Sequence, residues 1–240
     1  MVKKLKLFEK ALALAERRLV RLLVFGGAAA LTLAALYLAL VWSPDAEGEP
    51  ATYRIIYFHV PTAIMAYLGF FAVFAGSITY LWKGDMVFDR IAKVGGELGV
   101  LFCSLMLLTG MIWGKQRWGA WWLWEPRLTT ALILLVIYAG YLILRNTLDN
   151  QVTRARYAAV FGIVGFVDVP IVHYAIKLWG NVMHPVVIKS VKDPGMPPEM
   201  LMALRVSLLA FLAIFAALFL VRLRLENLSA EAARLRGEAE

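Results

Sequence analysis

Cysteine is almost absent from this chain, which contains one, Cys103, among 240 residues. A single cysteine excludes a disulfide within the chain, and the Cys-x-x-Cys-His sequence that attaches haem covalently is also missing. The phosphate-binding pattern Gly-x-x-x-x-Gly-Lys-Ser/Thr does not occur either. The chain therefore hydrolyses no nucleotide through such a loop, and any energy input must come from another protein.

Charge is also scarce, because 18% of the residues are charged and 61% are hydrophobic, with a mean hydropathy of +0.70. One aqueous core cannot hide that much apolar surface. Six segments reach the roughly 20 apolar residues that a membrane-spanning helix needs. They lie at about 21–42, 60–82, 94–113, 128–144, 157–178 and 201–221. We expect an all-α integral membrane protein, a six-transmembrane-helix bundle that forms one polytopic domain over residues 1–240.

The distribution of lysine and arginine predicts the orientation. Of the 25 cations, 17 fall in the two termini and in the second and fourth connections between spans. Cation-rich loops stay on the cytoplasmic side. We therefore expect both termini to be cytoplasmic, with a tail over 223–240, and the segment 114–127 to be external. The net charge of +8 then reflects topology and contact with anionic membrane lipid, and not binding to nucleic acid.

The external segment is rich in tryptophan. Four of the eight tryptophans lie within seven residues, at Trp118, Trp121, Trp122 and Trp124. Gly119 and Pro126 interrupt this stretch, which is too short to span a membrane. The pattern indicates a flat aromatic platform at the membrane surface.

Only three histidines occur, and all three map to the side of the tryptophans. His59 precedes the second span, His173 lies just inside the outer end of the fifth, and His184 follows it. Two imidazoles from opposite edges of a bundle, with indoles around them, suit a planar metalloporphyrin with an axial nitrogen on each face. Interfacial tryptophan and hydrogen-bonded histidine are also ordinary in membrane proteins, so the residues alone leave both interpretations open.

Three cations of the same segment, Lys115, Arg117 and Arg127, are candidates to pair with the carboxylates of a porphyrin. Three further ionisable residues fall inside spans, which is costly. We expect Asp168 and Arg205 to pair with each other, and Glu97 to reach water at the cytoplasmic end. Gly95 and Gly99, four residues apart, predict close helix packing.

The residues from Trp118 to Thr129, Trp-Gly-Ala-Trp-Trp-Leu-Trp-Glu-Pro-Arg-Leu-Thr, resemble the tryptophan-rich signature of the haem-handling proteins of cytochrome c maturation. Together with six spans and two external histidines, they resemble the haem exporter protein C family of maturation system I over nearly the whole chain. Phe58-His59-Val60-Pro61 matches the first ligand position of that family, and the stretch from Trp179 to His184-Pro185 matches the second.

The resemblance implies a non-enzymatic haem delivery protein of the bacterial inner membrane. His59 and His184 would ligate the iron of a non-covalent haem b, and the tryptophan segment with Glu125 and Arg127 would hold the porphyrin. The implied partners are a periplasmic haem chaperone, the subunits of an ABC transporter and a small membrane subunit. The family usually has Asp after the last tryptophan of the signature, where this chain has Glu125. Pro126 also fits the first position of a helix.

Two other functions remain open from the residues. A b-type electron-transfer cytochrome would need histidine pairs that face each other within the spans, and here one external pair is expected. A solute permease would need polar residues that step across the bilayer, and Asp168, Arg205 and Glu97 are few for such a path.

Overall fold

The computed structural model describes residues 18–46, 51–180 and 195–237. Over these ranges it is helical and has no strand, and six segments are long and apolar enough to cross a membrane. These segments are Leu22–Trp42, Ala51–Lys83, Met86–Trp118, Pro126–Thr147, Gln151–Trp179 and Pro198–Leu235. The all-α, six-span architecture expected from the sequence is confirmed.

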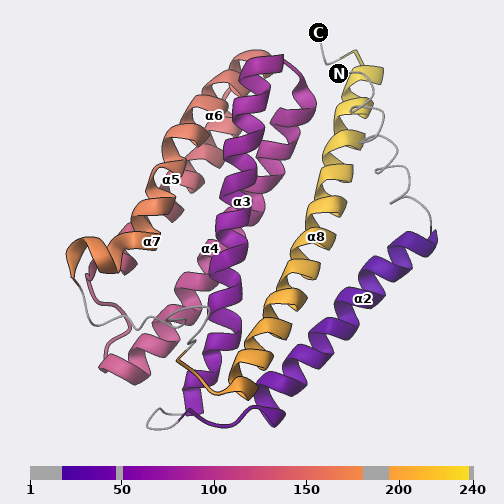
Figure 1. Cartoon of the computed structure of the whole chain (residues 1–240). Coiled ribbons are helices and arrows are strands. Elements are labelled where there is room, and N and C mark those ends of the chain that lie inside the picture. The colour runs from indigo at the N-terminus through magenta and orange to yellow at the C-terminus, as the bar shows by residue number, and fades with distance from the viewer. Residues whose placement is uncertain (1–17, 47–50, 181–194, 238–240) are drawn as a thin grey trace.

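The helices form three groups, as Figure 1 shows. Helices α3 (Ile56–Lys83) and α4 (Met86–Trp118) lie between the other two groups. On one side lie α5 (Pro126–Thr147), α6 (Gln151–Phe166) and α7 (Asp168–Trp179). On the other side α2 (Arg18–Tyr37) packs along α8 (Pro198–Leu235). A π-helical turn, Leu38–Trp42, extends α2, and a 3₁₀ turn, Ala51–Ile55, leads into α3.

Helices α3 and α4 approach each other at glycines. A Cβ atom placed on Gly69 would lie 2.6 Å from the backbone nitrogen of Gly99, and one on Gly95 would lie 2.8 Å from the carbonyl oxygen of Gly69. No side chain fits at such a distance, so the two backbones touch directly. The close packing predicted from the spacing of Gly95 and Gly99 is confirmed.

The fifth span is broken, although the sequence suggested one helix over 157–178. A turn at Val167 separates α6 from α7. Pro170 follows three residues later and has no backbone N–H to donate to the carbonyl of Phe166, four residues earlier. After the break α7 packs against α5, whereas α6 packs against both α3 and α5. Figure 1 shows α7 leaning away from α3.

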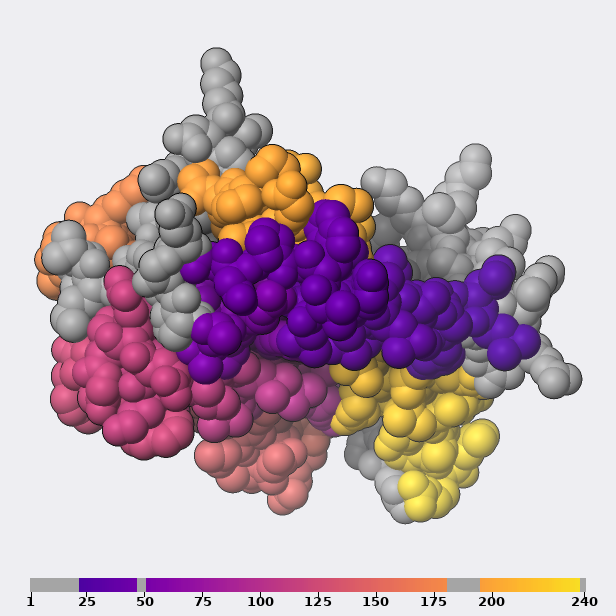
Figure 2. Space-filling view, turned by 90° about the horizontal axis from the view of Figure 1, so that it is seen from below, coloured from indigo at the N-terminus to yellow at the C-terminus, as the bar shows by residue number. Residues whose placement is uncertain are grey.

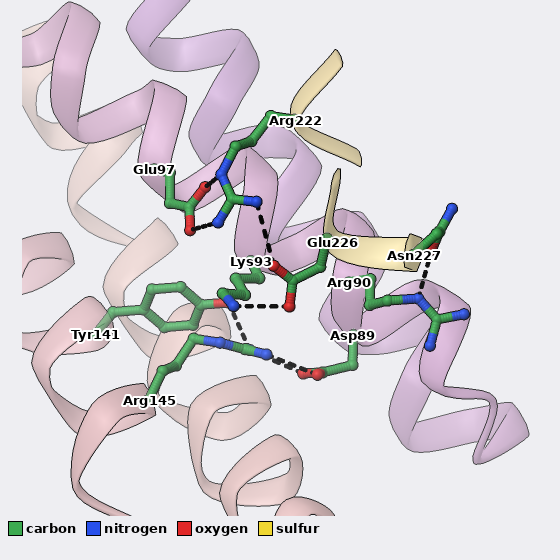
Figure 3. Close-up of polar contacts among 9 residues, drawn as sticks. All are labelled: Asp89, Arg90, Lys93, Glu97, Tyr141, Arg145, Arg222, Glu226 and Asn227. Carbon is green, nitrogen blue, oxygen red and sulfur yellow. Dashed lines mark hydrogen bonds and ion pairs between the residues drawn. The ribbon is translucent and has the colours of Figure 1, made fainter. Parts of the chain in front are cut away.

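A buried ion pair joins α4 to α5 at the end of the bundle where α4 begins (Figure 3). Arg145 donates from Nη1 to Asp89 Oδ1 at 2.8 Å and from Nη2 to Asp89 Oδ2 at 2.6 Å. The exposed fractions of the two side chains are only 4% and 5%. The Tyr141 hydroxyl accepts a further hydrogen bond from Arg145 Nη1 at 3.1 Å. This fork holds the beginning of α4 against the end of α5.

A second ionic group joins α4 to α8 at the same end (Figure 3). Arg222 lies between two carboxylates, with its Nε 2.7 Å from Glu97 Oε2 and its Nη1 3.2 Å from Glu226 Oε2. Lys93 Nζ donates to Glu226 Oε1 at 2.6 Å. Glu97, which was expected to reach water at this end, remains 26% exposed and is also paired with Arg222, because α8 extends beyond its most apolar part.

Candidate functional site

His59 lies in the first turn of α3 and is held by the end of α4. Its Nδ1 is 3.0 Å from the carbonyl oxygen of Met106 and 3.1 Å from Thr109 Oγ1. A carbonyl oxygen only accepts, so Nδ1 carries the hydrogen, and in the neutral ring Nε2 keeps its lone pair. A second hydrogen-bonding group that fixes the tautomer is the usual support of a metal-ligating imidazole.

Gly110 makes room for this ring. A Cβ atom at that position would lie 3.1 Å from His59 Cε1. The absence of a side chain on α4 therefore lets the imidazole lie against the helix backbone beside the carbonyl that orients it.

A small cavity of about 50 Å³ lies beside His59. Its walls come from α3, α4, α7, the start of α5 and the tryptophan segment, and the lining residues are His59, Ala63, Tyr67, Met106, Leu107, Gly110, Met111, Trp122, Arg127, Leu128, Ala131 and Val172. This space is enough for one or two water molecules. A planar ligand therefore enters only if the tryptophan segment or a neighbouring helix moves.

The tryptophan segment starts inside α4 and leaves it at a glycine. Helix α4 runs to Trp118, five residues past the expected end of the span, and Gly119 ends it with φ of +73°. Lys115 Nζ donates to the carbonyl oxygen of Gly119 at 2.9 Å. Trp118 lies edge-on to Trp113, with ring centres 5.1 Å apart. The first tryptophan of the segment thus packs back on its own helix.

The remaining three tryptophans lie in different environments. Trp121 and Trp124 are 54% and 77% exposed, whereas Trp122 lines the cavity beside His59. The rings of Trp122 and Trp124 meet at 78°, so they do not form one flat surface as the sequence suggested. The indole Nε1 of Trp122 is buried and has no hydrogen-bond partner among the residues that the structure describes. An unpaired buried donor beside the cavity is a place for an acceptor on a ligand. Figure 2 views this end of the molecule, with the tryptophan segment and the end of α4 in pink and the start of α8 in orange.

Glu125 and Pro126 begin α5. The Glu125 carboxylate accepts from the backbone nitrogen of Leu128 at 2.8 Å, and Pro126 occupies the first turn. This is an N-cap followed by proline at its favoured position. Glu125 is 6% exposed, so its carboxylate fixes the direction in which the tryptophan segment enters α5.

Of the three cations suggested as carboxylate partners, Arg127 is the one in the cavity lining. Lys115 is used by Gly119, and Arg117 lies exposed in the last turn of α4. His184 falls outside the described residues, so its place beside His59 stays a prediction.

The expected pair between Asp168 and Arg205 was wrong. Asp168 begins α7, and its Oδ2 is buried with no hydrogen-bond partner in the described part of the chain. Arg205 is exposed on α8, and α7 and α8 are not among the closely packed helix pairs of the described structure. The break at Val167 directs α7 toward α5 and away from α8.

Sequence reasoning missed Tyr67, Thr109 and Gly110. Tyr67 had a usable signal, because it follows His59 by eight residues, which is about two helical turns and therefore the same face. Thr109 and Gly110 had none, since only the packing of α4 on α3 brings them to His59.

Six apolar helices define the class as a multi-pass membrane protein. An oriented imidazole, a buried indole N–H and a guanidinium gather around a cavity at one end of its bundle and form a candidate ligand site. The model of one family, Heme exporter protein C, matches residues 2–237. The chain therefore belongs to the Heme exporter protein C family.

Curated relatives agree with this assignment. Heme exporter protein C of Haemophilus influenzae is 34% identical over 211 residues, which are 85% of each chain. The Escherichia coli K12 protein of the same name is 35% identical over 185 residues, covering 76% of this chain and 74% of its own. The Paracoccus denitrificans protein is 34% identical over 208 residues, covering 85% and 84%.

Proposed function

We propose that this protein binds haem at the outer end of the bundle and delivers it to a periplasmic haem chaperone during the maturation of c-type cytochromes. The observation that carries the proposal is the orientation of His59. Its Nδ1–H points at Met106 O and Thr109 Oγ1, which leaves Nε2 as an electron-pair donor beside the cavity. Membership of the Heme exporter protein C family supplies the cargo.

His59 and His184 are the two axial ligands in this proposal, and the haem is haem b, held without a covalent bond. Trp122 and Arg127 would meet the propionate carboxylates, because a guanidinium and an indole N–H that bonds to no described residue both lie in the cavity wall. Trp118, Trp121, Trp124 and Glu125 complete the site, with Trp121 and Trp124 supplying exposed aromatic surface and Glu125 fixing the segment.

Delivery then requires only ligand exchange. A group on the chaperone competes for the iron, and the porphyrin leaves when the imidazoles release it, so this chain forms no covalent intermediate and we propose that it is not an enzyme. The proposed setting is the bacterial inner membrane with both termini in the cytoplasm, in a complex with ABC transporter subunits and a small membrane subunit.

The test of the proposal is the absorbance spectrum of the detergent-purified protein with haem supplied, both oxidised and reduced. We expect a low-spin bis-imidazole spectrum for the parent and its loss in the His59→Ala/His184→Ala variant. A second step mixes loaded protein with the purified chaperone and follows haem transfer. A variant with the haem content and spectrum of the parent would refute the axial assignment, and retained ligation without transfer would refute delivery.

A further inference from the structure

A second concavity lies on the lateral surface of the bundle, between α3 and α7. It measures about 540 Å³, within the range of small-molecule sites. It exists because the break at Val167 turns α7 onto α5 and away from α3, while α6 stays packed on α3. Its walls are apolar and aromatic, with Tyr67, Phe71, Phe166 and Tyr174 among them. We refer to it as the α3–α7 groove.

His173 is the imidazole of this groove. It is exposed, and its ring lies edge-on to Tyr174 with ring centres 4.8 Å apart. The groove opens on the side of a span, where lipid is the solvent. A polar ring at such a position is costly, so it indicates a functional site.

Tyr67 separates the groove from the cavity beside His59. It is the residue that lines both spaces. On the opposite wall, Val172 faces the cavity and its neighbour His173 faces the groove. The groove, which is open to the bilayer, and the cavity beside His59 are therefore about one side chain apart.

We propose that the α3–α7 groove is an entry site for metalloporphyrin that arrives from the lipid, with His173 as a transient iron ligand and Tyr67 as the side chain that must move for passage. This inference rests on the proposed function. An aromatic groove offers flat apolar contact to a porphyrin ring, and an imidazole offers a nitrogen ligand for its iron, which lipid chains lack.

The transfer step is an exchange between neutral nitrogen donors. The bond from iron to the ring nitrogen of His173 breaks as the bond to His59 Nε2 forms, with no change in oxidation state and no net movement of protons. The haem moves from His173 to His59 in this proposal, because the Nδ1 of His59 is hydrogen-bonded to α4 and its ring is therefore already oriented for the iron.

The kinetic test uses the full chain in phosphatidylethanolamine/phosphatidylglycerol vesicles, mixed with vesicles of the same lipids that carry haem. The rate of loading is followed by the growth of the Soret band. We expect His173→Asn and Val169→Trp, which fills the groove, to slow loading about tenfold while the final haem content and spectrum stay those of the parent. Val160→Trp is the matched control, because Val160 is exposed on α6 and does not line the groove. Parent rates in both groove variants would overturn the inference.

An equilibrium test separates this inference from the proposed function. In the His59→Ala/His184→Ala background, haem in the vesicle should still give a weak imidazole-ligated spectrum that the added His173→Asn change removes. A residual spectrum that does not depend on His173 would overturn the groove site even if the axial assignment of His59 stands. Full haem content in the His59→Ala/His184→Ala variant would refute the axial assignment. If that haem were lost on adding His173→Asn, the groove site would still be supported.

Discussion

Thr109 helps to orient the imidazole of His59. Its Oγ1 lies 3.1 Å from Nδ1 and itself donates to the carbonyl oxygens of Leu105 and Met106. Thr109→Val keeps the shape and removes one acceptor of the Nδ1 hydrogen, leaving the Met106 carbonyl alone. We expect haem affinity to fall about 10- to 100-fold, the usual effect of losing such a supporting group. Haem titration measures it.

The control for that change is Ser104→Ala on the same helix, because the Ser104 hydroxyl donates to the carbonyl oxygen of Val100 within α4, at 2.8 Å. Equal losses in both variants would mean that the effect comes from α4 as a whole and not from the orientation of His59.

A substitution at Gly110 tests how closely the His59 ring must pack against α4. With a Cβ 3.1 Å from His59 Cε1, Gly110→Val would push the imidazole off the helix and away from Met106 O. We expect the bis-imidazole spectrum to be lost while the protein still folds. Gly26→Val is the control, since a Cβ at Gly26 meets no atom within 4 Å. A normal spectrum in Gly110→Val would show that the ring tolerates displacement.

At the scale of elements, the contact between α3 and α4 has no room for a side chain. Gly99→Val would place a Cβ 2.5 Å from the Phe70 ring and 3.3 Å from the backbone nitrogen of Phe70 on the opposite helix. Overpacking of this kind typically costs about 1–3 kcal/mol. We expect a lower unfolding temperature in detergent for Gly99→Val, and little change for Gly140→Ala, whose Cβ would make an ordinary contact of 3.6 Å with Phe161.

The buried pair between α4 and α5 gives an element-scale prediction of a different kind. Removing one partner, as in Arg145→Met, leaves Asp89 charged and buried, which costs about 3–5 kcal/mol. Replacing both, as in Asp89→Leu/Arg145→Met, should recover much of that loss. Chemical unfolding of the two single variants and the double variant measures the coupling. If the loss of unfolding free energy in the double variant equalled the sum of the losses in the two single variants, the two side chains would not be coupled.

The sequence predicted which segments are helical better than where the helices break and how they contact one another. Long apolar runs defined six spans, and Pro126 marked the start of α5 correctly. The break at Val167 was missed, because the apolar run continues through it and Pro170 alone does not decide between a kink and a break. The ionic group of Glu97 and Arg222 was missed as well, since it joins residues 125 positions apart.

The sequence likewise predicted only some residues of the candidate site. His59, Trp122 and Arg127 were found from residue type and order along the chain, and the structure brings these three together at one cavity. Their supports, Thr109 and Gly110, come from a neighbouring helix, and a single sequence carries no sign of which α4 residues will face α3.

At the scale of the whole molecule, the orientation is a prediction with its own measurement. The turns at Gly84 and Gly119 are both exposed and stand at opposite ends of α4. The cation distribution places Gly84 in the cytoplasm and Gly119 outside. A reporter enzyme inserted at each turn reads the side directly. The opposite readings would invert the topology and move the His59 site to the cytoplasm.

The pairing of α2 with α8 sets an order of assembly. Between Tyr37 and Pro198 lie 160 residues, so the partner of the first span is made last. By contrast, α3 and α4 are joined by Gly84 and Asp85 alone, and so short a connection makes their association fast. During synthesis α2 must therefore wait in the bilayer as a single helix. Its exposed leucines and the absence of charge from Leu22 to Trp42 suit it to that interval, since lipid alone solvates it until α8 arrives and closes the bundle.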